Sequence, residues 1–449
     1  MLFKRKIYET MKKWKELSAG SSALLIEGAR RVGKSTTAEH FARNEYEDYL
    51  ILDFSAEAKD VRDNFDNIGN PEAFFRNLFL LKGKELPPKK SVIIFDEVQL
   101  FPLARQAIKH LVKDGRFDYI ETGSLITIKK NVQNILIPSE EYKIKMYPMD
   151  FEEFLWATGD RITMKAVHEA FHNRSPLGDF AHRKIMQQFR TYMAVGGMPQ
   201  AVEAFTGNAS FRNIDFVKRN ILDLYEDDLK KYDTENNEKA SVIFRTIPTQ
   251  LAKHNSHFVF SEVDKNARYK NYVDAVEFVA ESMMGNLCVN VTYPDVSLEM
   301  YEERNNFKLY MGDTGLLVTQ IMRNGMETEN SLYKALIFNR LGINQGMILE
   351  NTVAQMLRAN GHRLFFHEYM YRAEENEREQ KYEIDFLTVR DRKIVPLEVK
   401  SSSYRNHQSF DYFVKKYPIP VQDRVVIYGK DLTQRDGILY IPFYMTCCL

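Results

Sequence analysis

The chain has 449 residues, enough for about three domains that each bury a core. Hydrophobic residues make up 44% of it and charged residues 28%, as in ordinary globular proteins, and the formal net charge of zero excludes an overall field that attracts nucleic acid or anionic membranes. The three cysteines, Cys288, Cys447 and Cys448, have no metal-ligand spacing and indicate no disulfide framework. We therefore expect a cytoplasmic protein, and because no apolar run is long enough to span a bilayer we expect no membrane partner.

The first informative stretch is a predicted strand, a glycine-framed loop and a helix near the amino terminus. Loop 28–36 matches the pattern G-x-x-x-x-G-K-[ST], in which backbone N–H groups and the start of the next helix face nucleotide phosphates. Lys34 would reach the β- and γ-phosphates, and the Ser35 hydroxyl would ligate Mg²⁺. The alternative is a glycine-rich turn that binds nothing. The predicted nucleotide-binding residues are Gly28, Ala29, Arg30, Arg31, Val32, Gly33, Lys34, Ser35 and Thr36.

Two carboxylates end the third predicted strand. Residues 49–54 are predicted to form a second strand, and the continuous apolar run 91–95 suits a strand buried on both faces of a parallel sheet. Asp96 and Glu97 follow this run, where acids are costly unless a cation or a reaction uses them. We expect Asp96 to organise Mg²⁺ and Glu97 to polarise the attacking water as a catalytic base, with a solvated strand end as the alternative.

A fourth short strand, which ends in small hydroxyl residues, is predicted at 119–124. Because the carboxyl ends of parallel strands face the nucleotide in open α/β sheets, Thr122 or Ser124 could sense the γ-phosphate. An ordinary turn is the alternative, since the intervening residue is a glycine. Gln99 is a further candidate to position the attacking water.

These motifs together resemble prokaryotic AAA-type ATPases of the archaeal-ATPase-like group, which are similar to signal-transduction ATPases with numerous domains. Further landmarks of that family are the segments 146–155, 192–199, 247–253 and 307–317, so the resemblance covers nearly the whole chain. It implies ATP and Mg²⁺ as cofactors, a helical lid and a winged-helix-like unit. The family commonly has threonine where this chain has Ser35, which keeps the hydroxyl.

The middle of the chain is predicted to be mostly helical. We expect an AAA-type core at 1–158, a helical lid at 159–235 and a winged-helix-like domain at 236–318. Residues 241–310 carry seven Lys and Arg against nine Asp and Glu, whereas a domain that neutralises many phosphates should be basic. Packing against a protein partner is therefore at least as well supported as binding of DNA or RNA. The sequence leaves the oligomeric state open.

The last predicted domain, 319–449, contains a charged β-hairpin. Alternation along strands 381–389 and 393–400 places Glu383 and Asp385 on one face of their strand, and Glu398 and Lys400 on one face of the partner strand. Helix 347–359 carries Glu350 ahead of them. This D…E-x-K hairpin resembles the PD-(D/E)xK restriction-endonuclease-like fold, in which carboxylates hold Mg²⁺ and a lysine activates water.

The resemblance to that fold implies specific roles. Glu350, Asp385 and Glu398 would be metal ligands, and Asp385, Glu398 and Lys400 would be catalytic. Gln408 lies where some members carry a supporting polar residue. The alternative is a solvated face of cross-strand ion pairs.

The sequence thus predicts an α/β protein. Its parts are a P-loop NTPase parallel sheet, a helical lid, a winged-helix-like middle domain and an α/β restriction-endonuclease-like C-terminal domain. The expected function is that of an ATP-hydrolysing, nucleotide-gated switch in which Lys34 and Glu97 are catalytic. The alternatives are an ATP-regulated, Mg²⁺-dependent DNA or RNA nuclease, or an ATPase with a catalytically silent protein-docking module.

Overall fold

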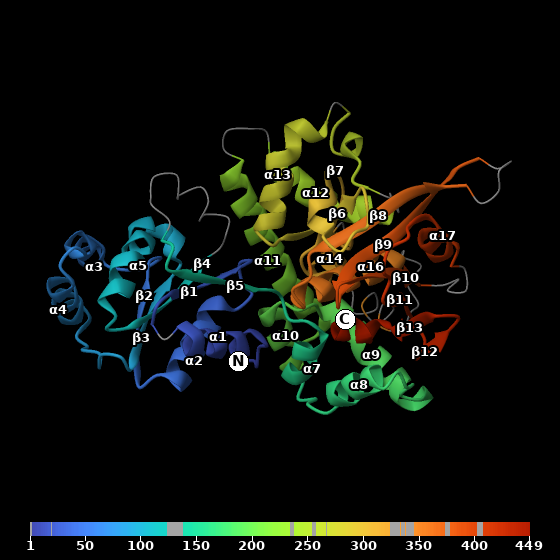
Figure 1. Cartoon of the computed structure of the whole chain (residues 1–449). Coiled ribbons are helices and arrows are strands. Elements are labelled where there is room, and N and C mark those ends of the chain that lie inside the picture. The colour runs from blue at the N-terminus through green and yellow to red at the C-terminus, as the bar shows by residue number, and fades with distance from the viewer. Residues whose placement is uncertain are drawn as a thin grey trace. The chain divides into compact units, whose positions relative to one another are not determined.

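A computed structural model describes most of the chain (Figure 1). The described residues are 2–18, 20–123, 138–233, 238–253, 257–265, 267–323, 333, 337, 345–372, 378–401 and 407–449. They divide into two compact units, Met1–Tyr147 and Pro148–Leu449. Among the described helices, none combines the length and apolarity needed to cross a membrane.

The described strands of the first unit form a five-stranded sheet in the order β2-β3-β4-β1-β5, with every pair parallel. This confirms the predicted P-loop type of sheet. The strands are β1 (Ala23–Gly28), β2 (Asp48–Asp53), β3 (Ser91–Asp96), β4 (Asp118–Gly123) and β5 (Glu141–Met146). The helices are α1 (Ile7–Ser18), α2 (Lys34–Glu45), α3 (Lys59–Asp63), α4 (Pro71–Lys82) and α5 (Pro102–Asp114).

The core of this unit explains the apolar runs in β1 and β3. All six residues of β1 are buried, and one face of the sheet packs against α4 and α5 through a cluster rich in phenylalanine. Helix α4 is delimited by local signals: Asn70 caps its first turn, Pro71 starts it, and Gly83 ends it with φ 61°. The unit therefore follows from the apolar pattern and from helix-terminating residues.

The second unit joins a helical region to a mixed sheet. Its helices include α7 (Phe151–Ala157), α8 (Thr163–His172), α9 (Asp179–Val195), α10 (Pro199–Thr206), α11 (Phe211–Tyr232), α12 (Lys239–Ala252), α13 (Tyr269–Glu281), α14 (Thr314–Ile321), α16 (Gln345–Ala359) and α17 (Gln408–Lys416). Its strands are β6 (Gly285–Val291), β7 (Glu302–Met311), β8 (Leu364–Tyr371), β9 (Gln380–Arg390), β10 (Lys393–Lys400), β11 (Arg424–Tyr428), β12 (Thr433–Arg435) and β13 (Ile438–Pro442).

These eight described strands form one sheet in the order β12-β13-β11-β10-β9-β8-β6-β7. The β6–β7 hairpin, expected in a separate winged-helix-like domain, continues this sheet because β6 pairs in parallel with β8. In Figure 1 the yellow hairpin runs into the orange strands. The predicted boundary between residues 318 and 319 therefore falls inside one structural unit, and the separate C-terminal domain with a mixed sheet begins earlier than expected.

The predicted boundary between residues 158 and 159 also differs from the structure, which divides the chain after Tyr147. Helix α7 belongs to the second unit because the backbone before it is held there: the N–H of Met149 donates to the carbonyl oxygen of Gly197 at 2.8 Å. The helices of the predicted lid pack within this unit, α9 and α11 against α14.

Close backbone packing joins two of the landmark segments. The Asp313 carboxylate accepts the N–H of Gly197 at 2.6 Å and that of Leu316 at 2.9 Å, so it caps α14 and binds the turn after α9. A Cβ added to Gly197 would lie 2.0 Å from the carbonyl oxygen of Met149, and one added to Gly315 would lie 2.4 Å from that of Val195. Glycine is required at both positions because only a bare Cα permits this approach.

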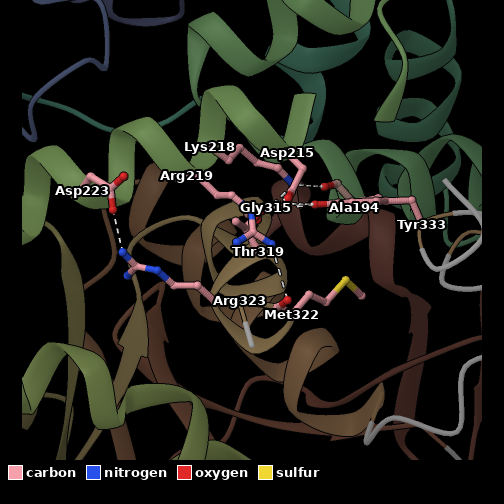
Figure 2. A network of polar contacts seen from close by, with 10 residues as sticks. All are labelled: Ala194, Asp215, Lys218, Arg219, Asp223, Gly315, Thr319, Met322, Arg323 and Tyr333. Atoms are coloured by element: carbon pink, nitrogen blue, oxygen red, sulfur yellow. Dashed lines mark hydrogen bonds and ion pairs between the residues drawn. The ribbon is translucent and has the colours of Figure 1, made fainter. Parts of the chain in front are cut away.

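A buried polar network reinforces the same junction (Figure 2). Lys218 on α11 is fully buried, and its Nζ donates to the carbonyl oxygens of Ala194 at 2.7 Å and Gly315 at 3.2 Å. One turn earlier, Asp215 accepts the hydroxyls of Thr319 at 2.9 Å and Tyr333 at 2.6 Å. The network joins α9, α11 and α14 through satisfied buried polar groups.

Candidate functional site

The loop between β1 and α2 has the backbone geometry of a phosphate cradle. Gly33 adopts φ 97° immediately before α2, and Arg31 adopts φ 67°, so the chain curls twice in the left-handed region. At the other end, a Cβ on Gly28 would lie 2.4 Å from the carbonyl oxygen of Met146 on β5. Both framing positions therefore favour glycine on steric grounds. The N-terminus of helix α2 faces the loop.

The Lys34 ammonium lies folded onto the loop itself. Its Nζ donates to the carbonyl oxygens of Gly28 at 3.1 Å and Ala29 at 3.0 Å. Burial lowers the pKa of Lys34 to about 8, although the carboxylates of Glu97 and Asp96 act in the opposite direction. The ammonium is thus bonded to two carbonyl oxygens of the loop, which are groups that a phosphate oxygen could replace.

The two predicted magnesium ligands are in direct contact. The Ser35 hydroxyl donates to Oδ1 of Asp96 at 2.6 Å, and Thr122 donates from its hydroxyl to the same oxygen. The sheet brings them together because β3 and β4 are neighbours and end at the same edge. A hydroxyl and a carboxylate are oxygen donors of the kind Mg²⁺ prefers, so these residues fit the ion.

Two neighbours contact Glu97, one at its backbone and one at its side chain. Its backbone adopts φ 52°, an uncommon conformation for a non-glycine residue, and its N–H donates to the hydroxyl of Thr122 at 3.4 Å. The amide of Gln99 donates to the Glu97 carboxylate. Gln99 thus orients the predicted base. Ser124, the other predicted sensor, lies outside the described residues.

The remaining loop residues divide by exposure. Ala29 and Val32 are buried, Arg30 is half-buried, and Arg31 and Thr36 are exposed.

One residue that holds the loop could not be identified from the sequence. Arg5, before α1, donates from Nη1 to the carbonyl oxygen of Val32 at 2.8 Å and from Nη2 to that of Tyr147 at 2.6 Å. It is a buried arginine from a distant part of the sequence, and no local motif marks it.

A second group of acids lies in the other unit around a cavity of about 300 Å³. Glu350 from α16 and Asp385 from β9 both line it, together with Glu383 and Lys400. Glu398 is fully buried and makes other contacts: its carboxylate accepts the hydroxyl of Ser409 and lies 2.8 Å from Nζ of Lys400.

The centre of this group is occupied by Lys308 from β7. Its Nζ lies 2.5 Å from Oε1 of Glu383 and 3.4 Å from Oε1 of Glu350, and the hydroxyl of Tyr310 donates to that same Glu350 oxygen at 2.6 Å. The pKa of Lys308 is raised well above its usual value because Glu350, Glu383 and Asp385 together outweigh the effect of burial. We name Lys308, Glu350, Glu383 and Asp385 the acidic cluster.

The Asp385 carboxyl has a raised pKa, so it holds its proton more tightly than an ordinary aspartate does. Burial, followed by the charge of Glu350, raises its pKa to about 8, while Lys308 acts in the opposite direction. Its Oδ2 accepts the backbone N–H of Val399 at 2.7 Å. A carboxyl that holds its proton more tightly than usual and already accepts a backbone hydrogen bond is a weakened ligand for a divalent cation.

The predicted metal set Glu350, Asp385 and Glu398 is not brought together as a cation site. Among the described residues, no group of three or more His, Cys, Asp or Glu side chains has the arrangement of metal ligands. The arrangement present does not fit Mg²⁺, because an ammonium lies among the carboxylates and Glu398 is paired elsewhere. At the start of α17 the residue that contacts Glu398 is Ser409, next to the predicted Gln408.

Lys308 and Tyr310 were missed as site residues, although the sequence carries a signal for them. They alternate with apolar residues in the buried second half of β7, within the landmark segment 307–317, and period two places them on one face. A lysine and a tyrosine at buried alternate positions call for polar partners on the neighbouring elements.

Comparison with known families identifies the first unit. Residues 20–155 match the family model described as an AAA domain. The amino-terminal unit has the fold of an AAA-type P-loop ATPase. Residues 186–327 and 345–445 match families described as domains of unknown function, DUF8612 and DUF4143. No curated protein matches the chain.

Solved structures show only remote similarity to the chain. A Walker-type ATPase of Pyrococcus abyssi is 13% identical with a TM-score of 0.42, over 71% of this chain and 96% of that one. The RuvB Holliday junction branch migration motor of Thermotoga maritima is 12% identical with a TM-score of 0.28, over 63% and 89%. The AAA-type assignment rests on the family match and on the loop geometry, not on these neighbours.

Proposed function

We propose that the chain binds ATP with Mg²⁺ at the loop 28–36, hydrolyses it, and uses the nucleotide state to control its second unit. The observation that carries this proposal is the contact between Ser35 and Asp96, since it joins the phosphate loop to the acidic strand end at the atoms that would hold the ion. The three free cysteines, two of them buried, suit a reducing cytoplasm.

The residues of the proposed nucleotide site then have the following roles in binding and hydrolysis. The loop N–H groups and the start of α2 bind the phosphates, and Lys34 exchanges its bonds to Gly28 and Ala29 for bonds to phosphate oxygens. Ser35 and Asp96 would hold Mg²⁺, which neutralises charge on the β- and γ-phosphates when bound. Glu97, oriented by Gln99, accepts a proton from the attacking water.

Phosphate release from ATP tests this proposal. Wild-type protein should release phosphate in a Mg²⁺-dependent manner, Lys34→Ala should bind ATP about 10–100-fold more weakly and should not hydrolyse it, and Glu97→Gln should bind ATP without hydrolysis. Lys59→Ala is the matched control, because this lysine is 86% exposed and pairs only weakly with Asp63 at 3.9 Å. Hydrolysis that survives in Lys34→Ala would refute the proposal.

For the second unit, we propose a catalytically silent docking module whose partner is a protein. The position of Lys308 among the carboxylates favours this function over a nuclease that acts on DNA or RNA. The experiment is cleavage of plasmid, single-stranded and structured substrates with Mg²⁺ or Mn²⁺, with and without ATP. Cleavage that is lost in Asp385→Ala and Lys400→Ala would establish the nuclease; no cleavage of any substrate supports the docking module.

A further inference from the structure

We propose that Lys308 is the resident cation of the acidic cluster, so that the wild-type cluster binds no divalent ion and replacement of Lys308 creates a divalent-cation site. This inference concerns the second unit alone and requires neither ATP binding nor hydrolysis. Its failure would therefore leave the proposed ATPase function intact.

The geometry places the ammonium where carboxylates from separate elements converge. Lys308 extends from β7, Glu350 from α16, and Glu383 from β9, and only 8% of Lys308 is exposed. The ring of Phe366 lies under the ammonium, with its centroid 5.3 Å from Nζ. The hydroxyl of Tyr310 satisfies the remaining capacity of the Glu350 oxygen. The ammonium is thus held from several sides.

Charge balance explains why a cation is needed there. Glu350 and Glu383 surround Lys308, and Asp385 lies close enough to raise its pKa. Buried carboxylates are tolerated only when they are paired, coordinated to a metal or protonated. Lys308 supplies the pairing for the two glutamates, and the N–H of Val399 donates to Asp385.

The same geometry excludes a second cation. Mg²⁺ needs near-octahedral oxygen ligands at about 2.0–2.1 Å, and an ammonium 2.5 Å from Glu383 occupies that carboxylate. Lys400 likewise occupies Glu398. In contrast, a chain without the Lys308 ammonium would leave the Glu350 and Glu383 carboxylates facing a polar cavity, and one or two carboxylates are enough for a divalent ion that keeps several waters.

Manganese binding to the full chain without nucleotide tests the inference, in an Asp96→Asn background that removes the proposed ion site of the AAA-type domain. In this background, chains with the wild-type cluster and with Asp385→Asn should give the same Mn²⁺ titration curve. Lys308→Met should gain one saturable Mn²⁺ site, and millimolar Mn²⁺ should raise its unfolding temperature by several degrees. Adding Glu383→Gln to Lys308→Met should abolish both effects.

Matched controls separate this effect from the loss of any buried lysine. Lys218→Met removes a lysine that is equally buried in the same unit but bonded to carbonyl oxygens, and it should gain no Mn²⁺ site. Lys308→Arg keeps the cation and should also gain none. Mn²⁺ binding by the parent chain that Asp385→Asn removes would overturn the inference, even if Lys308→Met failed to fold. A folded Lys308→Met that binds no Mn²⁺ would overturn it equally.

Discussion

The hydroxyl of Ser35 donates a hydrogen bond to Oδ1 of Asp96 at 2.6 Å, across 61 positions of sequence. This contact links the start of α2 to the end of β3, and Thr122 at the end of β4 donates to the same oxygen. The start of α2 and the ends of β3 and β4 therefore meet at the Asp96 carboxylate. The arrangement orients Asp96 before any ion arrives.

The Thr122 hydroxyl should matter for hydrolysis even though it need not touch the nucleotide. Thr122→Val should lower Mg²⁺-dependent ATP hydrolysis by about 10–100-fold, the usual effect of losing a group that orients a metal ligand. Thr122→Ser keeps the hydroxyl and should retain most activity. Steady-state phosphate release at varied Mg²⁺ measures this, and equal activity in the valine and serine variants would contradict it.

The Lys34 ammonium should destabilise the empty protein at neutral pH. Burial lowers its pKa from 10.5 to about 8, so the unfavourable contribution is complete below about pH 8 and disappears as the pH rises to 10.5. Without nucleotide, Lys34→Met should therefore increase the free energy of unfolding at pH 7 by roughly 1–3 kcal/mol, with a smaller gain at higher pH. Urea unfolding at pH 7 and pH 9.5 measures it. A variant that is less stable than wild type at pH 7 would contradict the account.

The glycines between α9 and α10 and at α14 should tolerate no side chain. Gly197→Ala would place a Cβ 2.0 Å from a backbone oxygen and should destabilise the second unit by at least about 2 kcal/mol. Gly429→Ala is the control in the same unit, since its nearest contact would be 3.9 Å away, and it should be nearly neutral. Thermal unfolding compares the two, and equal midpoints would refute the packing argument.

The Cys448 thiol should be unusually reactive. A hydrogen bond with Cys447 and then the pairing with His168 at 3.4 Å lower its pKa to about 6, and Glu152 lies 3.4 Å from the other ring nitrogen. Iodoacetamide should therefore modify Cys448 at a rate that is half-maximal near pH 6, with the midpoint higher in His168→Ala. The buried Cys288 serves as the slow internal reference in mass spectrometry. A wild-type midpoint at the ordinary value of about 8.5 would contradict this.

The nucleotide site could be predicted because its parts are local or follow from one rule of sheet geometry. The loop pattern fixes Lys34 and Ser35 at the start of a helix, and the carboxyl ends of parallel neighbours meet at one edge, which brings Asp96 and Thr122 to it. No local pattern predicts the contacts that residues outside the motif make with the loop. Arg5 reaches Val32 across 27 positions, and its approach depends on the folded unit.

The second unit was predicted less well because its sheet is assembled from distant pieces. Lys308 meets Glu383 across 75 positions, and that contact requires β6 and β7 to join the strands that follow α16. Sequence periodicity placed Asp385 and Glu398 on facing strands but gave no information about which side chain would fill the space between the acids. The parallel pairing of β6 with β8 decides this, and parallel pairs are formed between segments far apart in sequence.

Calorimetric titration of ATP with Mg²⁺ tests the central claim most directly. The account predicts saturable binding by the wild-type chain and binding that is about 10–100-fold weaker in Lys34→Ala, the loss expected for charge-assisted hydrogen bonds to phosphate. Lys59→Ala should match the wild type. No binding heat with the wild type at any pH from 7 to 8, or equal affinity in Lys34→Ala, would contradict the claim that the loop 28–36 holds a triphosphate.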